Sequence, residues 1–129
     1  MSDNRPIRLV LDTSAVLAFV RQSVHVGEVL VEVDDNAAVA AIPLACLVEA
    51  ARDAVDHDQL VFLAEHPSTV IVAEEAGHWR MLGGLCSMTG GYASASAALT
   101  ALDARCWVLT ANPAIYASVG GELAVPIED

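Results

Sequence analysis

The chain has 129 residues, 55% of them hydrophobic, and this length and composition predict one globular domain over residues 1–129. It carries 17 acidic residues against six basic ones, giving a net charge of −11, and all six bases are arginine. Lysine is absent, which excludes P-loop ATPases, Schiff-base enzymes and receiver domains, because each needs one. Such a charge repels nucleic acid in bulk, so an RNA contact would need a local arginine patch or a bridging metal ion.

Targeting signals and cysteine usage predict where the protein works. No apolar run reaches the ~20 residues of a membrane-spanning helix. The opening MSDNRPIRLV lacks the basic-then-apolar layout of a secretory signal. Cys46, Cys86 and Cys106 are an odd number, far apart and without a CxxC pair, which is typical of reduced, buried thiols. We therefore expect a cytoplasmic protein with no membrane association.

Short apolar runs alternate with stretches of helical periodicity, beginning with an expected strand at 7–11. This alternation predicts an α/β fold, a three-layer α/β/α sandwich with a mainly parallel central sheet. Further strands are expected at 38–43, 68–74 and 106–110, with a proline-containing edge strand at 123–127. Helices are expected at 14–20, 26–35, 44–56, 58–66, 76–87, 92–104 and 112–118. The helix from residue 44 is expected to turn Leu44, Leu47, Val48 and Ala51 inward.

The first expected strand ends on Asp12, within LVLDTSAVLAF at residues 9–19. In parallel α/β sheets, ligands bind at the carboxyl ends of the strands, near the point where the strand order reverses. Asp12 therefore has two interpretations: an N-cap, for which Asp-Thr-Ser is well suited, or a functional carboxylate. Haloacid-dehalogenase chemistry is excluded, because it needs a second aspartate where this chain has Ser14.

A second acid, Glu49, lies near the start of the helix after the second expected strand, in CLVEAAR. Its apolar neighbours in the sequence place it at the border of the buried side of this helix. It could instead be a first-turn glutamate that the helix dipole favours. Together, Asp12 and Glu49 would suit Mg²⁺, which prefers oxygen ligands and needs few carboxylates when a substrate phosphate completes its shell.

The sequence resembles the PIN-domain fold, and most closely its bacterial VapC-type toxin branch. The matching segments are LVLDTSAVLAF, IPLACLVEAAR and ASASAALTALDARCWVLTANPAIYA, which frame nearly the whole chain. Members of this family are typically Mg²⁺- or Mn²⁺-dependent endoribonucleases with three or four acids around the metal. The resemblance implies hydrolysis of RNA phosphodiesters and an antitoxin protein as partner.

Carried over by position, the resemblance assigns the first two acids, and the metal ligands, to Asp12 and Glu49. Ser14 and Thr110 match the hydroxyl residues that usually support the site. The third acid should fall at Ser94, which is not acidic.

The fourth acid should fall at Asn112, which is also neutral. Between Glu75 and Asp103 there is no acid, so a shifted alignment recovers none, and Asp103 is expected to point away from the site. Asn112-Pro113 also has a structural interpretation, since asparagine at the N-cap followed by proline begins a helix well.

The two missing acids weaken the expected metal site and leave two function classes open. A unit charge pair ~4 Å apart is worth ~4 kcal/mol at an effective dielectric of about 20 before desolvation. Two missing carboxylates therefore predict a degenerate site that holds its metal poorly. One hypothesis is a weakened, metal-dependent endoribonuclease. The other is a non-catalytic PIN-like module for protein contact, with a homodimer face on the helix that has four alanines between Ala93 and Ala98.

Overall fold

The computed structural model describes residues 4–120 and 122–129, so residues 1–3 and 121 of the expected domain lie outside the description. The predicted alternation of strands and helices is confirmed, with boundaries that differ from the expected ones by a few residues. The elements are β1 (Ile7–Leu11), α1 (Thr13–Val20), α2 (Val24–Asp35), β2 (Val39–Pro43), α3 (Leu44–Asp53), α4 (His57–Ala64), β3 (Thr69–Val72), the 3₁₀ helix η1 (Ala76–His78), α5 (Trp79–Thr89), α6 (Tyr92–Ala104), β4 (Trp107–Thr110), the 3₁₀ helix η2 (Pro113–Tyr116) and β5 (Ala124–Pro126).

The sheet is parallel throughout, in the order β3-β2-β1-β4-β5. After the central strand β1, the chain adds β2 and β3 on one side and then crosses over to add β4 and β5 on the other. The strand order therefore reverses between β1 and β4, and the carboxyl ends of these two strands form the switch point. β5 is an edge strand, as predicted.

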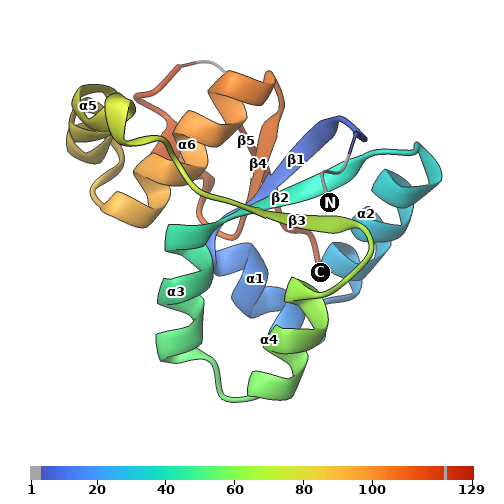
Figure 1. Cartoon of the computed structure of the whole chain (residues 1–129). Helices are drawn as coiled ribbons and strands as arrows, with labels where there is room; N and C mark the ends of the chain where they lie inside the picture. The colour runs from blue at the N-terminus through green and yellow to red at the C-terminus, as the bar shows by residue number, and fades with distance from the viewer. Residues whose placement is uncertain (1–3, 121) are drawn as a thin grey trace.

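Helices cover both faces of the sheet, so the predicted three-layer sandwich is confirmed (Figure 1). Successive side chains of β1 point to opposite faces. Leu9 and Leu11 pack with α1, α2 and α4, whereas Val10 packs with α5 and α6. α3 follows directly from β2 and joins both cores, through Ala50 on one side and Cys46 on the other.

The buried face of α3 differs from the expected one. Cys46 and Ala50 are buried, whereas Leu44 and Val48 are 45% and 62% exposed, so the prediction that these two larger residues point inward is wrong. The small side chains of Cys46 and Ala50 let α3 pack closely against the neighbouring layers, and close packing, not hydrophobicity alone, decides its rotation.

The alanine-rich part of α6 is buried within this fold. Ala93, Ala95, Ala97 and Ala98 are each at most 7% exposed and pack in the same core as Val10. Small residues here allow the helix to approach the sheet closely. The interpretation of these alanines as a homodimer face is therefore wrong.

Within residues 4–120 and 122–129, no single helix is long and apolar enough to cross a membrane. α1 and α2 meet the requirement on length and composition only as a pair, with a bend of 107° between them. The cysteines are free thiols, buried at Cys46 and half-buried at Cys86 and Cys106, so the expected burial holds fully only for Cys46.

Candidate functional site

A cleft of about 420 Å³ lies at the switch point of the sheet, beside the carboxyl ends of β1 and β4. Its walls come from the first turn of α1, from α3, from the α5–α6 turn and from the segment after β4. All six residues singled out in the sequence line it: Asp12, Ser14, Glu49, Ser94, Thr110 and Asn112. The fold thus brings residues that are up to 100 positions apart in the sequence, such as Asp12 and Asn112, into one cleft.

Asp12 is the most deeply placed acid of the cleft, with 4% of its surface exposed. Its Oδ1 accepts hydrogen bonds from the Ser14 hydroxyl at 2.6 Å and from the Ala15 N–H at 3.1 Å. The second of these bonds caps α1, so the N-cap interpretation of Asp12 is confirmed. The same side chain lines the cleft, and the two interpretations are therefore compatible.

Ser14 and Thr110 connect the Asp12 carboxylate to the end of β4. The Ser14 hydroxyl donates its one hydrogen to Asp12, so Thr110 must be the donor in the 3.2 Å contact between the two hydroxyls. The Ala111 N–H donates to Ser14 Oγ at 2.8 Å, and the Asn112 N–H donates to Thr110 Oγ1 at 3.0 Å. The donors therefore all run in one direction, from the backbone after β4 toward Asp12, and neighbouring bonds of this kind strengthen one another.

Tyr116 on η2 is a cleft residue that sequence reasoning missed. Its side chain is 1% exposed, and its hydroxyl donates to Asp12 Oδ2 at 2.7 Å. Burial, reinforced by the Asp12 charge, raises the pKa of the Tyr116 phenol above its ordinary value, so the hydroxyl keeps its proton. An aromatic residue in NPAIYAS carries no sequence signal that separates this polar role from plain core packing.

Glu49 is half-buried and lies beyond the first turn of α3, a turn that contains no acid. Its interpretation as a first-turn glutamate is therefore wrong, and the helix dipole does not account for it. Asp53, four residues later, also lines the cleft, and this i, i+4 spacing was the signal that could have found it. Arg52 donates to both Asp53 oxygens, at 3.0 and 3.1 Å, and these bonds lower the pKa of the Asp53 carboxyl.

Neutral side chains occupy the other two assigned positions. Ser94 Oγ lies 2.8 Å from Thr89 Oγ1 and 3.1 Å from the Gly91 carbonyl oxygen, which ties the start of α6 to the end of α5. Asn112 is the residue before η2 and Pro113 follows, as predicted, but the exposed Asn112 side chain makes no capping hydrogen bond. Neither Ser94 nor Asn112 brings a charge to the cleft.

Asp103 does not replace the missing acids. It is exposed at the far end of α6 and lines a separate hollow together with Ile7 and Thr100. Among residues 4–120 and 122–129, no three Asp, Glu, His or Cys side chains are arranged to hold a metal. A centre of three or four acids therefore does not fit this part of the chain.

The oxygen atoms that line the cleft are of the kind that a divalent ion prefers as ligands. Carboxylate, hydroxyl and amide oxygens are the ligands that Mg²⁺ and Mn²⁺ prefer, and Mg²⁺ is commonly bound through one or two carboxylates plus substrate phosphate. Asp12 and Glu49 are two of the carboxylates that line the cleft, with Asp53 bonded to Arg52, and the exposed Asn112 amide adds a neutral oxygen.

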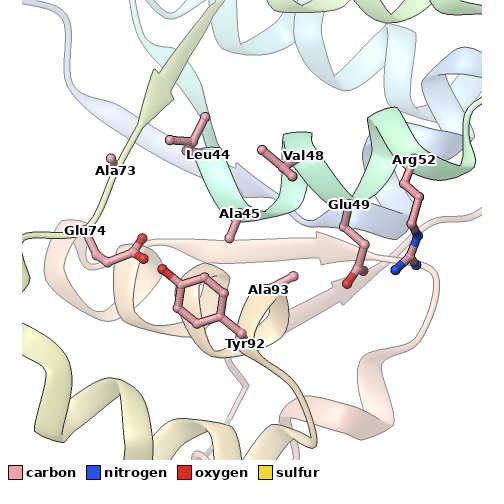
Figure 2. Close-up of a pocket in the computed structure, with 9 residues that line it drawn as sticks. All are labelled: Leu44, Ala45, Val48, Glu49, Arg52, Ala73, Glu74, Tyr92 and Ala93. Carbon is pink, nitrogen blue, oxygen red and sulfur yellow. The ribbon is translucent and has the colours of Figure 1, made fainter.

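A second groove, of about 430 Å³, adjoins the cleft and shares Glu49 and Ala93 with it (Figure 2). α3 contributes its exposed apolar side chains, Leu44 and Val48, and α6 contributes Tyr92, which is 55% exposed. The groove therefore extends the cleft with a mostly apolar surface that is open to solvent and also carries Glu49, Arg52 and Glu74.

A parallel five-stranded sheet, helices on both faces and an acidic cleft at the switch point are the features of a PIN-like α/β fold. The chain superposes over 95% of its length on the whole of a chain in the crystal structure of VapBC2 from Rickettsia felis bound to a DNA fragment from their promoter, with a TM-score of 0.70 and 15% identity. No family model matches the sequence, and no curated protein matches it. The likeness to VapBC2 shows the fold, and the fold predicted from the sequence is confirmed.

Proposed function

We propose that the chain is a VapC-like, Mg²⁺- or Mn²⁺-dependent endoribonuclease with a weakened site, in which Asp12 and Glu49 hold the ion. The observation that carries this proposal is that both acids line one cleft at the switch point of a VapBC2-like fold. A divalent ion bound there would polarise a phosphodiester and activate water for in-line attack. The chain's own contribution is to orient Asp12 through Ser14 and Thr110.

The missing charges make the proposed site weak. Ser94 and Asn112 take the positions where the family has acids. A charge pair ~4 Å apart is worth roughly 4 kcal/mol before desolvation, and ~1.4 kcal/mol is tenfold in affinity. Even after a large discount, two absent carboxylates lower metal affinity by orders of magnitude. The net charge of −11 also lowers the affinity for RNA, because it repels the phosphate backbone.

An antitoxin-type protein partner belongs to the same proposal. The resemblance to VapC-type toxins implies one, and the open apolar groove beside the cleft offers Leu44, Val48 and Tyr92 for contact with such a partner. A homodimer is also proposed, through a surface other than the buried alanines of α6.

Calorimetric titration with Mn²⁺ tests the metal site without knowledge of the RNA substrate. We expect weak, saturable binding by the wild type and none by Asp12→Ala, because that variant removes the central carboxylate. Asp103→Ala is the matched control, since it removes the same charge from an exposed position outside the cleft. It is expected to bind Mn²⁺ as the wild type does.

RNA cleavage is the second step of this test. Cleavage should require the divalent ion and should disappear in Asp12→Ala. Absence of Mn²⁺ binding up to millimolar concentrations, or binding that survives Asp12→Ala unchanged, would contradict the proposal. Either result would favour the alternative, a non-catalytic PIN-like module.

A further inference from the structure

Protein donors already occupy most of the acceptor capacity of the Asp12 carboxylate. A carboxylate offers about four lone-pair sites. Ser14 and Ala15 take both on Oδ1, and Tyr116 takes one on Oδ2. A cation that approaches from the cleft therefore finds about one site on Asp12 that is not already hydrogen-bonded.

The hydrogen bond from Tyr116 differs from the other two bonds to Asp12, because it comes from another element and does not cap a helix. The Ser14 and Ala15 bonds come from within the first turn of α1, where they serve the helix cap. Tyr116 comes from η2, 104 positions away, and its ring is packed in the core beneath the cleft. A hydroxyl held this firmly against a carboxylate makes a charge-assisted bond, which is stronger than a neutral one.

We propose that Tyr116 competes with a divalent cation for Asp12 Oδ2 and thereby sets the metal affinity of the cleft. The inference rests on the proposed function, because it takes Asp12 as the metal ligand. The positive end of the O–H dipole faces the oxygen that a cation needs, and the ion must displace or share that bond. Tyr116 is thus a positioning residue, which keeps the Asp12 carboxylate hydrogen-bonded to the protein when no metal is bound.

Tyr116→Phe tests the proposal, because it removes only the hydroxyl and keeps the ring in the core. Tyr92→Phe is the matched control for metal binding and stability, which do not involve the partner contact proposed for Tyr92: it is the other tyrosine of the chain, is 55% exposed, and its hydroxyl makes no hydrogen bond within the described residues. The readouts are the Kd of Mn²⁺ by calorimetry and the metal-free thermal midpoint. We expect Tyr116→Phe to bind Mn²⁺ about tenfold more tightly, as expected for loss of one bond to a charged group. Its metal-free midpoint should fall, and Tyr92→Phe should change neither quantity.

The possible results separate the inference from the proposed function. If the wild type binds Mn²⁺ and Tyr116→Phe binds no more tightly, the competition is overturned and the proposed function stands. If only Tyr116→Phe binds, the competition is supported and the proposed function of the wild type fails. Binding that persists when Asp12→Ala is added to Tyr116→Phe places the ion elsewhere and overturns the inference.

A second measurement needs no variant at position 116. Mg²⁺ is titrated into the wild type while the ring-carbon NMR signals of both tyrosines are followed. Competition predicts that the Tyr116 signal shifts with metal occupancy while the Tyr92 signal does not. A saturated metal site that leaves the Tyr116 signal in place overturns the inference.

Discussion

The Ser14 side chain links Asp12, at the end of β1, to the end of β4 by hydrogen bonds. Its hydroxyl donates to Asp12 and accepts from the Ala111 N–H, and it also contacts Thr110. Without Ser14 Oγ, the exposed Ala111 N–H can turn to water, but the fully buried Thr110 hydroxyl loses its acceptor. The position therefore has a structural role that is independent of any metal.

Ser14→Ala should lower the free energy of unfolding by about 1–3 kcal/mol, the usual penalty for a buried polar group left without a partner. Urea denaturation measures this, with the m-value expected to stay unchanged. Ser87→Ala is the matched control, because that exposed serine makes only a 3.4 Å contact with the Gly83 carbonyl of its own helix. Its effect should stay within about 0.5 kcal/mol. Equal effects at the two positions would contradict the role assigned to Ser14.

Residues beside the strand ends could be predicted, whereas Tyr116 could not. Asp12 stands out in the sequence because it directly follows a strand-like apolar run, and Glu49 because it stands among apolar neighbours. Tyr116 reaches Asp12 only through the packing of η2 against the core. Contacts between residues so far apart in the sequence depend on the tertiary fold, and no periodic sequence pattern predicts them.

Among the helices, periodicity predicted the elements but not their buried faces. The sequence predicts the full range of α6, but the alanines that it offers as a dimer face are buried in the core. α3 was rotated relative to expectation, with Leu44 and Val48 outside. In both helices most of the buried positions carry small residues, because small side chains let the layers pack closely. A hydrophobic pattern alone cannot show this preference.

Ala97→Leu tests the burial of α6, because Ala97 has no exposed surface. The added side chain should lower the free energy of unfolding by about 1–3 kcal/mol, the usual cost of overpacking a core. Ala76→Leu, at an exposed alanine of η1, is the control and should change stability by no more than about 0.5 kcal/mol. If Ala97→Leu left stability unchanged and altered the oligomeric state in size-exclusion chromatography, the alanines would be an interface after all.

For the whole molecule, the number and type of strands could be predicted, but their order could not. The alternation of apolar runs was enough to predict a parallel sheet covered on both faces. The crossover that places β4 beside β1, and so creates the cleft, depends on pairing between segments about 100 residues apart, which no local pattern encodes. The resemblance predicted the fold class, which the structure confirms, whereas the strand order is seen only in the structure.

A second long-range contact joins Asp129 to the start of α2. The Ser23 hydroxyl donates to Asp129 Oδ2 at 2.6 Å, and the His25 N–H donates to Oδ1 at 3.0 Å. The Glu128 N–H in turn donates to His25 Nδ1 at 2.7 Å. A carboxylate at a helix N-terminus is favoured by the helix dipole. The bonds from Ser23 and His25 lower the pKa of the Asp129 carboxyl below its ordinary value of 3.8.

This lowered pKa predicts how stability depends on pH. A group whose pKa is lower in the folded state stabilises the fold above its ordinary pKa, and the contribution disappears as the pH falls through the folded value. Asp129→Asn should therefore unfold more easily than the wild type at about pH 5, and the difference should shrink toward zero as the pH falls through the lowered pKa of the folded state. Urea denaturation across this range measures the effect, and comparison at each pH cancels the titration of the other acids. Asp103→Asn is the control, because the side chain of this exposed aspartate makes no hydrogen bond within the described residues, and it should change stability little. A stability difference for Asp129→Asn that stays constant down to the lowest pH would show that the contact does not depend on the charged carboxylate.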